Sequence, residues 1–180
     1  MPDKDTVTPR PSPPTGWRRA IARIPVLLFR AGLGPVFGQR LLLLHHAGRV
    51  SGLDRRVVLE VVAYEPDSRA WTVASGFGPG ADWYRNLRAQ PKTVLQFGNR
   101  HHAVTAYFLS PGDGAAIMEE YGARRPRTAR RLCAFMGLPA DGSASALRRA
   151  GHATPFVRLE SDTPPRNRAR RAGDGGRQER

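Results

Sequence analysis

Two glycine-bearing turns carry the residue types in this chain that are best suited to chemistry. The first turn, Gly48-Arg49-Val50-Ser51-Gly52, is followed closely by Arg55 and Arg56, and the second, 76–80, leads into a short helix that begins near Ala81. Backbone N–H groups at such turns and at helix N-termini bind phosphates and other anions, as guanidinium groups do. The pattern therefore predicts an anion-binding site formed by the two turns.

The elements that position these turns are expected to be mainly strands. Runs of apolar residues bounded by turn residues predict strands at 39–46, 56–64, 70–75, 93–97, 102–109 and 154–160. Turns at 65–68 and at Gly98-Asn99 would join neighbouring strands as hairpins. Closely spaced, hairpin-linked strands favour an antiparallel sheet or a small barrel, and the chain is therefore expected to be α+β and mainly β.

Helices are expected between and after these strands. The helix that follows Gly80 should stop before Pro91, and Ser110-Pro111-Gly112-Asp113 combines a capping serine, a first-turn proline and an acidic residue at a helix start. Glycines are common just beyond a helix end, so the later helices are expected to end at glycines. The three later helices are expected at 110–122, 126–137 and 144–151.

The two ends of the chain differ in composition from its middle. Residues 1–16 are rich in proline and polar residues, and 161–180 are rich in charged residues, so a disordered leader and a disordered basic tail are expected. Residues 17–160 would then form a single domain. Within it, 17–30 place apolar residues at helical spacing opposite arginines, which is typical of a helix that covers the core or lies peripherally on a membrane surface.

The chain has a net charge of +14 and a pI of about 11.5, which often indicates a nucleic-acid partner. Of the 29 basic residues, however, only Lys4 and Lys92 are lysines, and the richness in Arg, Ala, Gly and Pro is as typical of a GC-rich coding bias as of a binding surface. We therefore expect no nucleic-acid partner. A basic module that binds a membrane surface or nucleic acid stays open as an alternative to an enzyme.

Several common catalytic signatures are missing. Cys133 is the only cysteine, which excludes an internal disulfide and a zinc site built from cysteines, and it favours a reducing, cytoplasmic setting. His45-His46 and His101-His102 are adjacent pairs whose members point to opposite faces of a strand, so no metal site is expected. Residues 74–78 do not form a Gly-x-Ser-x-Gly elbow. An anion-binding sheet protein of this kind is typical of enzymes whose cofactor carries the chemistry.

Three motifs carry a resemblance to a known family. They are Gly48-Arg49-Val50-Ser51-Gly52 with Arg55, then Val73-Ala74-Ser75-Gly76, then 82–87 with Pro91. In this order the motifs resemble the deazaflavin-dependent nitroreductase and quinone reductase family. The resemblance implies a split β-barrel of the flavin-reductase (FMN-binding) type with flanking helices, and it implies coenzyme F420, an 8-hydroxy-5-deazaflavin, as the cofactor.

The resemblance also implies roles for individual residues. Arg49, Ser51 and Arg55 would hold the coenzyme's phosphate and acidic tail. The segment 73–76 would run along the deazaflavin ring, and the Ser75 hydroxyl would act in catalysis by donating a hydrogen bond to the acceptor oxygen. The implied cofactor-binding residues are Arg49, Val50, Ser51, Arg55, Arg56, Val57, Val58, Leu59, Val73, Ala74, Ser75, Gly76, Asp82, Trp83, Tyr84, Arg85 and Asn86.

The implied reaction is hydride transfer from reduced F420 to a quinone or a similar conjugated acceptor. Val50 and Gly76 stand where some family members carry lysine, and no secure counterpart of a substrate-side tyrosine follows Tyr121, so a quinone is favoured over a nitro compound. An FMN-binding or non-catalytic cofactor-binding split-barrel protein is the alternative. A homodimer is also left open.

Overall fold

The structure, a computed structural model, describes residues 40–135, 137–138 and 141–163. The expected leader, the helix expected at 17–30 and most of the expected tail lie outside these residues. The strands are β1 (Leu41–Ala47), β2 (Asp54–Glu65), β3 (Ala70–Ala74), β4 (Lys92–Phe97), β5 (Arg100–Phe108) and β6 (Phe156–Ser161). The helices are α3 (Asp82–Ala89), α4 (Pro111–Arg124), α5 (Pro126–Phe135) and α6 (Ala144–Ala153), with a 3₁₀ turn η2 (Gly78–Gly80) before α3.

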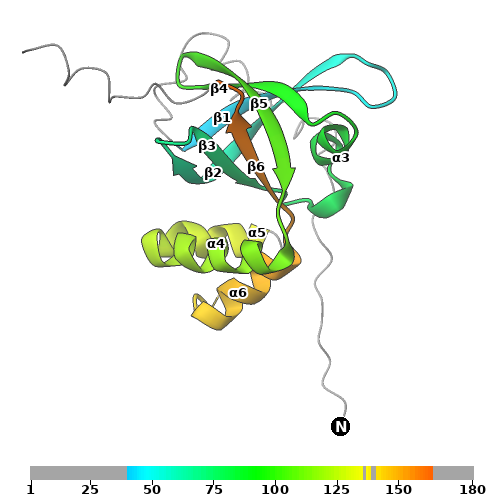
Figure 1. The fold of residues 1–180 in the computed structure, drawn as a ribbon. Helices are drawn as coiled ribbons and strands as arrows, with labels where there is room; N and C mark the ends of the chain where they lie inside the picture. Colours follow the sequence, from blue (N-terminus) through cyan, green and yellow to red (C-terminus); the bar gives the residue numbers. More distant parts are fainter. Residues whose placement is uncertain (1–39, 136, 139–140, 164–180) are drawn as a thin grey trace, which may run out of the picture.

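The strands close into one barrel in the order β1-β2-β3-β6-β5-β4, and every neighbouring pair is antiparallel. The predicted barrel with flanking helices is thus confirmed. Figure 1 shows the barrel above a layer made by α4, α5 and α6, with α3 at one side. The last strand, β6, lies between β3 and β5 and closes the barrel. It includes Ser161, one residue beyond the expected end of this strand, and the backbone N–H of Asp162 donates to the Ala103 carbonyl over 2.9 Å.

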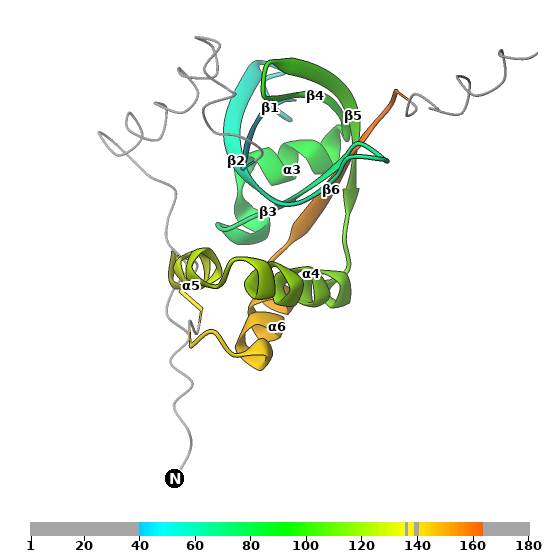
Figure 2. The same cartoon turned by 90° about the vertical axis from the view of Figure 1, so that its left-hand side faces the viewer.

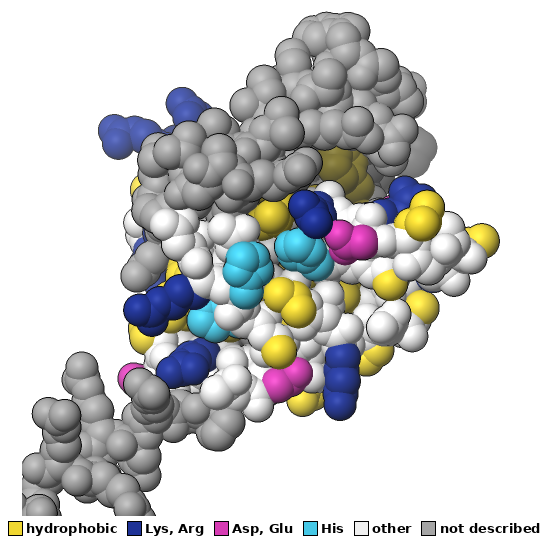
Figure 3. All heavy atoms as spheres, turned by 90° about the horizontal axis from the view of Figure 1, so that it is seen from above, with side chains coloured by type: hydrophobic (Ala, Val, Ile, Leu, Met, Phe, Trp, Pro, Cys, Tyr) yellow, Lys and Arg dark blue, Asp and Glu magenta, His cyan; other side chains and the backbone are white. Residues whose placement is uncertain are grey.

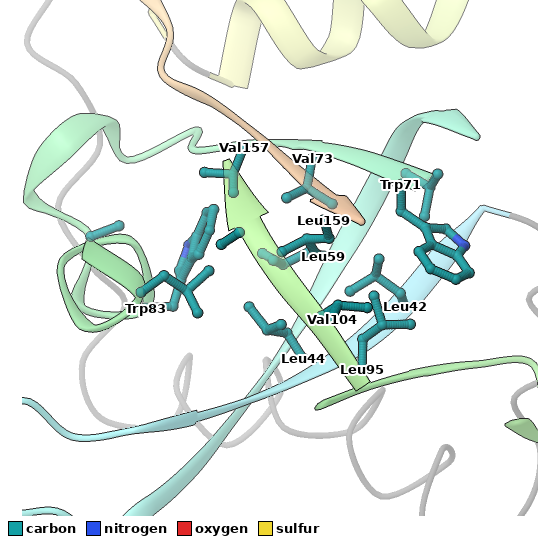
Figure 4. Packing of buried hydrophobic residues seen from close by; sticks show 14 residues of the cluster. Leu42, Leu44, Leu59, Trp71, Val73, Trp83, Leu95, Val104, Val157 and Leu159 are labelled. Atoms are coloured by element: carbon teal, nitrogen blue, oxygen red, sulfur yellow. The ribbon is translucent and has the colours of Figure 1, made fainter. Parts of the chain in front are cut away.

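The barrel core follows from the alternation of side chains along each strand. Leu42 and Leu44 of β1 point inward, and they meet aliphatic side chains from the other five strands. Trp83 and Leu87 of α3 complete this core. In Figure 4, Trp83 and Trp71 lie at opposite ends of the cluster. Helix α3 therefore closes one end of the barrel, and Figure 2 shows it across the ring of strands.

A second apolar cluster joins the outer face of the barrel to α4, α5 and α6. It contains Val62, Met118, Tyr121, Ala129, Cys133, Leu147, Ala150 and Phe156. Cys133 is buried there on α5, and burial raises the pKa of its thiol. None of the helices within the described residues has the length and apolar character needed to cross a bilayer.

The expected start of α4 is confirmed, whereas two expected helix ends were wrong. The Ser110 hydroxyl accepts a hydrogen bond from the Asp113 N–H, and the Asp113 carboxylate accepts one from the Ser110 N–H, which makes a capping box. Helix α4 continues through Gly122 to Arg124, and α6 continues through Gly151 to Ala153. These glycines are packing positions, because a Cβ on Gly151 would lie 2.3 Å from a backbone oxygen of α4.

Candidate functional site

A pocket of about 270 Å³ lies between the β1–β2 loop and α3. Its lining combines the first predicted glycine turn, 48–52, with the first two turns of α3. The second predicted glycine turn, 76–80, leads into this helix. The lining residues are Gly48, Arg49, Val50, Ser51, Arg55, Asp82 and Asn86. All of these except Gly48 are among the residues that the sequence predicts to bind a cofactor.

The β1–β2 loop owes its shape to backbone bonds and to two glycines. The Gly48 N–H donates to the Leu53 carbonyl over 2.9 Å, and the Gly52 N–H donates to the Gly48 carbonyl over 2.7 Å. Gly52 has a φ of 66°, a conformation that residues with a Cβ rarely adopt. A Cβ on Gly48 would lie 2.7 Å from the Ser51 Oγ and 3.1 Å from the Arg55 Nε. Glycine at position 48 therefore lets two polar side chains converge on the pocket.

Helix α3 fixes the position of Arg49. The Arg49 guanidinium donates from NH1 to the Asp82 carboxylate and to the Asn86 Oδ1, each over 3.1 Å. The backbone N–H of Arg49 also donates to the Asn86 Oδ1 over 3.1 Å. The helix thus holds both ends of this arginine and leaves its other guanidinium N–H groups free of any recorded bond within the described residues.

Asn86 is itself held by a histidine that the sequence analysis did not assign to the site. Asn86 is 3% exposed, and its Nδ2 lies 2.9 Å from the Nδ1 of His46, which is 6% exposed. Burial lowers the pKa of His46 below its ordinary value of 6.5, and the nearby Arg55 charge lowers it further. The alternation of side chains along β1 could have indicated that His46 is buried, because it shares one face of this strand with Leu42 and Leu44.

The pocket carries an excess of positive charge. Arg49 is offset by Asp82, whereas Arg55 has no recorded acidic partner in the part of the chain that the structure describes. Figure 3, a view from above, shows hydrophobic side chains exposed on the projecting β1–β2 loop. Val50 is 92% exposed and Leu53 is 63% exposed. The surroundings of the pocket are therefore both cationic and apolar.

Ser75 does not occupy the position expected of a catalytic group. It is 1% exposed, and its hydroxyl donates to the Gly78 carbonyl over 2.6 Å, while the Gly78 N–H donates to the Ser75 carbonyl over 2.8 Å. The hydroxyl is thus bonded to the backbone in this structure, and the expectation that it bonds an acceptor oxygen stays a prediction. The side chain is buried because it ties the chain as it leaves β3 to the turn η2.

Other predicted residues also lie outside the pocket lining. Leu59, Val73 and Trp83 have side chains in the barrel core, and Ala74 packs against the helix layer, so none of these four side chains faces the pocket. Arg56 is exposed and pairs with Asp54 over 3.2 Å. The predicted residues that the lining does not include are Arg56, Val57, Val58, Leu59, Val73, Ala74, Ser75, Gly76, Trp83, Tyr84 and Arg85.

Comparison with protein families gives a match over residues 29–132 to the family described as F420H(2)-dependent quinone reductase. The matched segment is more than half of the 180-residue chain and includes the whole pocket lining. The chain belongs to this family. It is accordingly an oxidoreductase that depends on coenzyme F420, as the sequence motifs predicted.

Solved structures give weaker similarities. One F420-H2 dependent reductase is 19% identical over 68% of this chain and 95% of its own, with a TM-score of 0.46. A pyridoxamine 5'-phosphate oxidase-related, FMN-binding protein from Nostoc punctiforme is 18% identical over 84% of this chain and 81% of its own, with a TM-score of 0.43. No curated protein matches the chain. The family assignment is therefore based on the family match alone.

The pocket suits part of coenzyme F420. A phosphate needs convergent N–H donors, and the crowding at Gly48 brings Ser51 and Arg55 together, with Arg49 beside them. The Ser51 Oγ accepts from the Leu53 N–H over 3.4 Å, which leaves its own hydrogen available to a ligand. A volume of about 270 Å³ accommodates a phosphate and its neighbouring atoms.

Proposed function

We propose that this pocket holds the phosphate and acidic tail of coenzyme F420 and that the enzyme passes a hydride to a menadione-like quinone. The observation that carries the proposal is the convergence of Arg49, Ser51 and Arg55 on one cavity that α3 closes. When bound, reduced F420 supplies the hydride. The protein has to hold the coenzyme, shield it from water and leave one face open to the acceptor.

The three polar residues would share the work of binding. Arg49 is held by Asp82 and Asn86 before any ligand arrives, so little of its conformational entropy is lost on binding. Arg55 supplies the charge that no recorded carboxylate offsets within the described residues. Ser51 adds a neutral donor at the rim. Asp82 has a supporting role, because its negative charge would repel a phosphate but also orients Arg49.

Ser75 would act on the site only through the backbone. Its hydroxyl fixes η2, and η2 leads directly into α3, which carries Asp82 and Asn86. We therefore expect Ser75→Ala to change coenzyme affinity and turnover together. A loss of turnover without a loss of affinity would restore the direct catalytic role that the sequence suggested.

An apolar quinone suits the surroundings of the pocket better than a nitro compound. Val50 lines the pocket and Leu53 follows it in the same loop, and both are exposed. Tyr121, after which the sequence offers no secure counterpart of a substrate-side tyrosine, is buried in the helix layer, and its hydroxyl donates to the Glu60 carboxylate over 2.7 Å. It has no part in the pocket lining.

The test begins with coenzyme binding. Purified protein is mixed with F420 or with FMN, and retention of each is measured on a sizing column. We expect F420 to be retained, whereas retention of FMN alone would favour the alternative cofactor. Reduced F420 is then mixed anaerobically with protein and a panel of quinones and nitroaromatics. If no quinone is reduced faster than without protein, the quinone reductase activity is ruled out for this chain.

Three further expectations stay predictions. They are a cytoplasmic location, a single domain over 17–160 with disordered ends, and a homodimer. Light scattering measures the mass of the particle directly, and limited proteolysis maps the domain ends. A peripheral membrane contact through 17–30 would appear as co-sedimentation with anionic vesicles that is lost when this segment is removed.

A further inference from the structure

His46 combines burial, an ionisable ring and a contact with the group that holds Arg49. Its ring lies 2.9 Å from the Asn86 amide, and both side chains are almost fully buried. The Asn86 amide in turn contacts Arg49 twice. A chain of three residues therefore runs from the barrel end to the pocket.

The chemistry of the three groups fixes which atoms donate. Both recorded contacts from Arg49 come from N–H groups, so the Asn86 atom that faces Arg49 must be the carbonyl oxygen. The Asn86 NH₂ then faces His46, and it can only donate. The His46 Nδ1 must accept, which requires the neutral ring with its proton on Nε2.

We infer that His46 is a positioning residue whose neutral, Nε2-protonated form sets the Asn86 amide and, through it, Arg49 in the pocket. The link from Arg49 to the coenzyme rests on the proposed function. The link from His46 to Arg49 does not, because it is a property of the protein without ligand.

Protonation of His46 would break the chain at either contact. A proton on Nδ1 would face the Asn86 NH₂, so two donors would meet. If the amide rotated to present its oxygen to the ring, its NH₂ would face the N–H groups of Arg49. In the first case repulsion displaces the Asn86 amide, and in the second Arg49 loses this acceptor outright, so Asn86 no longer fixes the orientation of Arg49 in the pocket.

The charges around His46 come from three elements. Arg55 of β2 and His45 of β1 disfavour the charged ring, whereas Asp54 of β2 and Asp82 of α3 favour it. Burial is the largest influence and acts in the same direction as Arg55 and His45, and the pKa is lowered. Since the ordinary value is 6.5, the ring is neutral at and above neutral pH.

The first experiment needs no coenzyme. The ¹⁵N resonances of the imidazole are recorded through a pH titration and assigned by their loss in His46→Asn. We expect the Nε2–H tautomer, a pKa below 6.5 and an Arg49 backbone amide resonance that moves with the same midpoint. An Nδ1–H tautomer would overturn the inference, as would an Arg49 resonance that does not follow His46.

Two substitutions test the consequence for binding. In His46→Asn the side-chain oxygen replaces Nδ1 as acceptor and cannot titrate, whereas in His46→Gln the oxygen lies near the place of Nε2. We expect F420 affinity in the wild type to fall about fivefold (about 1 kcal/mol) on acidification through the His46 pKa. His46→Asn should bind at the neutral-pH level without this step, and His46→Gln should bind weakly throughout.

The outcomes separate the two proposals. If His46→Asn keeps the acid step, or if His46→Gln binds as the wild type does, His46 does not position Arg49 for binding. If no variant retains F420 at any pH, the proposed site falls, and the titration of His46 and Arg49 alone decides the inference. Far-UV circular dichroism confirms that each variant keeps its strands.

Discussion

The pocket and the helix layer both hold polar side chains by hydrogen bonds, yet they leave these side chains in different states. At the pocket, Arg49 bonds to Asp82 and Asn86 and still faces a cavity with donors to spare. In the helix layer, Tyr121 and Glu60 form a donor–acceptor pair that borders no part of that cavity. The same kind of bond therefore orients an arginine at a cavity in one region and joins a helix to the barrel in the other.

Glycine shows the same division between the two regions. At Gly48 the missing side chain leaves room for the side chains of Ser51 and Arg55. At Gly151 it leaves room for the backbone of α4, including the Gly114 carbonyl. Side chains can move when they are crowded, and backbones in packed helices cannot do so without shifting the helix. Substitution should therefore affect ligand binding at the pocket and stability in the helix layer.

The largest effect is expected for Gly151→Ala. The new Cβ would meet the Gly114 carbonyl oxygen at 2.3 Å and the Met118 Cβ at 2.7 Å, so α4 and α6 must separate. Overpacking of this kind costs about 1–3 kcal/mol or more in the free energy of unfolding. Urea denaturation measures this loss. The matched change Gly112→Ala, whose nearest atom is 3.7 Å away, should be close to neutral, and equal losses in both would contradict the packing role.

Arg55→Glu should be next in size and should act on binding alone. It places a negative charge in the cavity where we propose an anionic tail, and losing one charge-assisted contact costs about 1.5–3 kcal/mol. F420 affinity should fall by roughly tenfold or more while the unfolding free energy is kept. The control is Arg131→Glu, which makes the same charge change at an exposed residue of α5 in the helix layer. If both variants lose affinity equally, the effect is one of net charge, and Arg55 has no specific role.

Much of the fold could be predicted from the sequence, because it depends on local patterns. The alternation of apolar residues and the turn at Gly98, which has a φ of 58°, fix strands and hairpins over short distances. The ends of α4 and α6 could not be placed, because Gly122 and Gly151 read as stop signals. The role of these two glycines depends on how closely two helices pack, and a local sequence pattern does not indicate that distance.

The site was predicted in part for a similar reason. Arg49 and Ser51 belong to the β1–β2 loop and Arg55 to the start of β2, so their proximity follows from the sequence. The directions of Ser75 and Trp83 could not be read from it, since a residue in a motif can face the core as easily as the cavity. His46 was missed because its role depends on Asn86, which is 40 residues away in the chain.

Tyr121→Phe tests the helix-layer side of the comparison. It removes one buried hydroxyl and leaves Glu60 partly exposed to water, which can replace the lost partner. The expected loss is about 1 kcal/mol in the free energy of unfolding, with no change in F420 affinity. Urea denaturation and coenzyme retention are measured on the same preparation. A clear loss of affinity would mean that the two regions are coupled, and the division between them would not hold.

The smallest effect concerns His102, which lies against Trp71 at the barrel end opposite α3, with ring centroids 4.8 Å apart. Burial lowers the pKa of His102 below 6.5, and the charges of Arg69 and Arg100 lower it further. As the pH falls below 6.5, the unfolded chain therefore binds more protons than the folded one. The stability that the neutral ring contributes is complete above pH 6.5, and it is lost as the pH falls through the pKa of His102 in the folded state.

His102→Gln should make the unfolding free energy less dependent on pH in this range without abolishing the dependence, because His45 and His46 also have lowered pKa values. Urea denaturation at about pH 7.5 and about pH 5.5 measures the difference. F420 affinity should keep its pH dependence in this variant, whereas His46→Asn should remove it. A barrel end remote from the pocket would then affect only stability, and His46 would affect both stability and binding. If His102→Gln also removed the pH dependence of F420 affinity, the loss of affinity at acid pH would come from the barrel as a whole and not from the contact between His46 and Asn86.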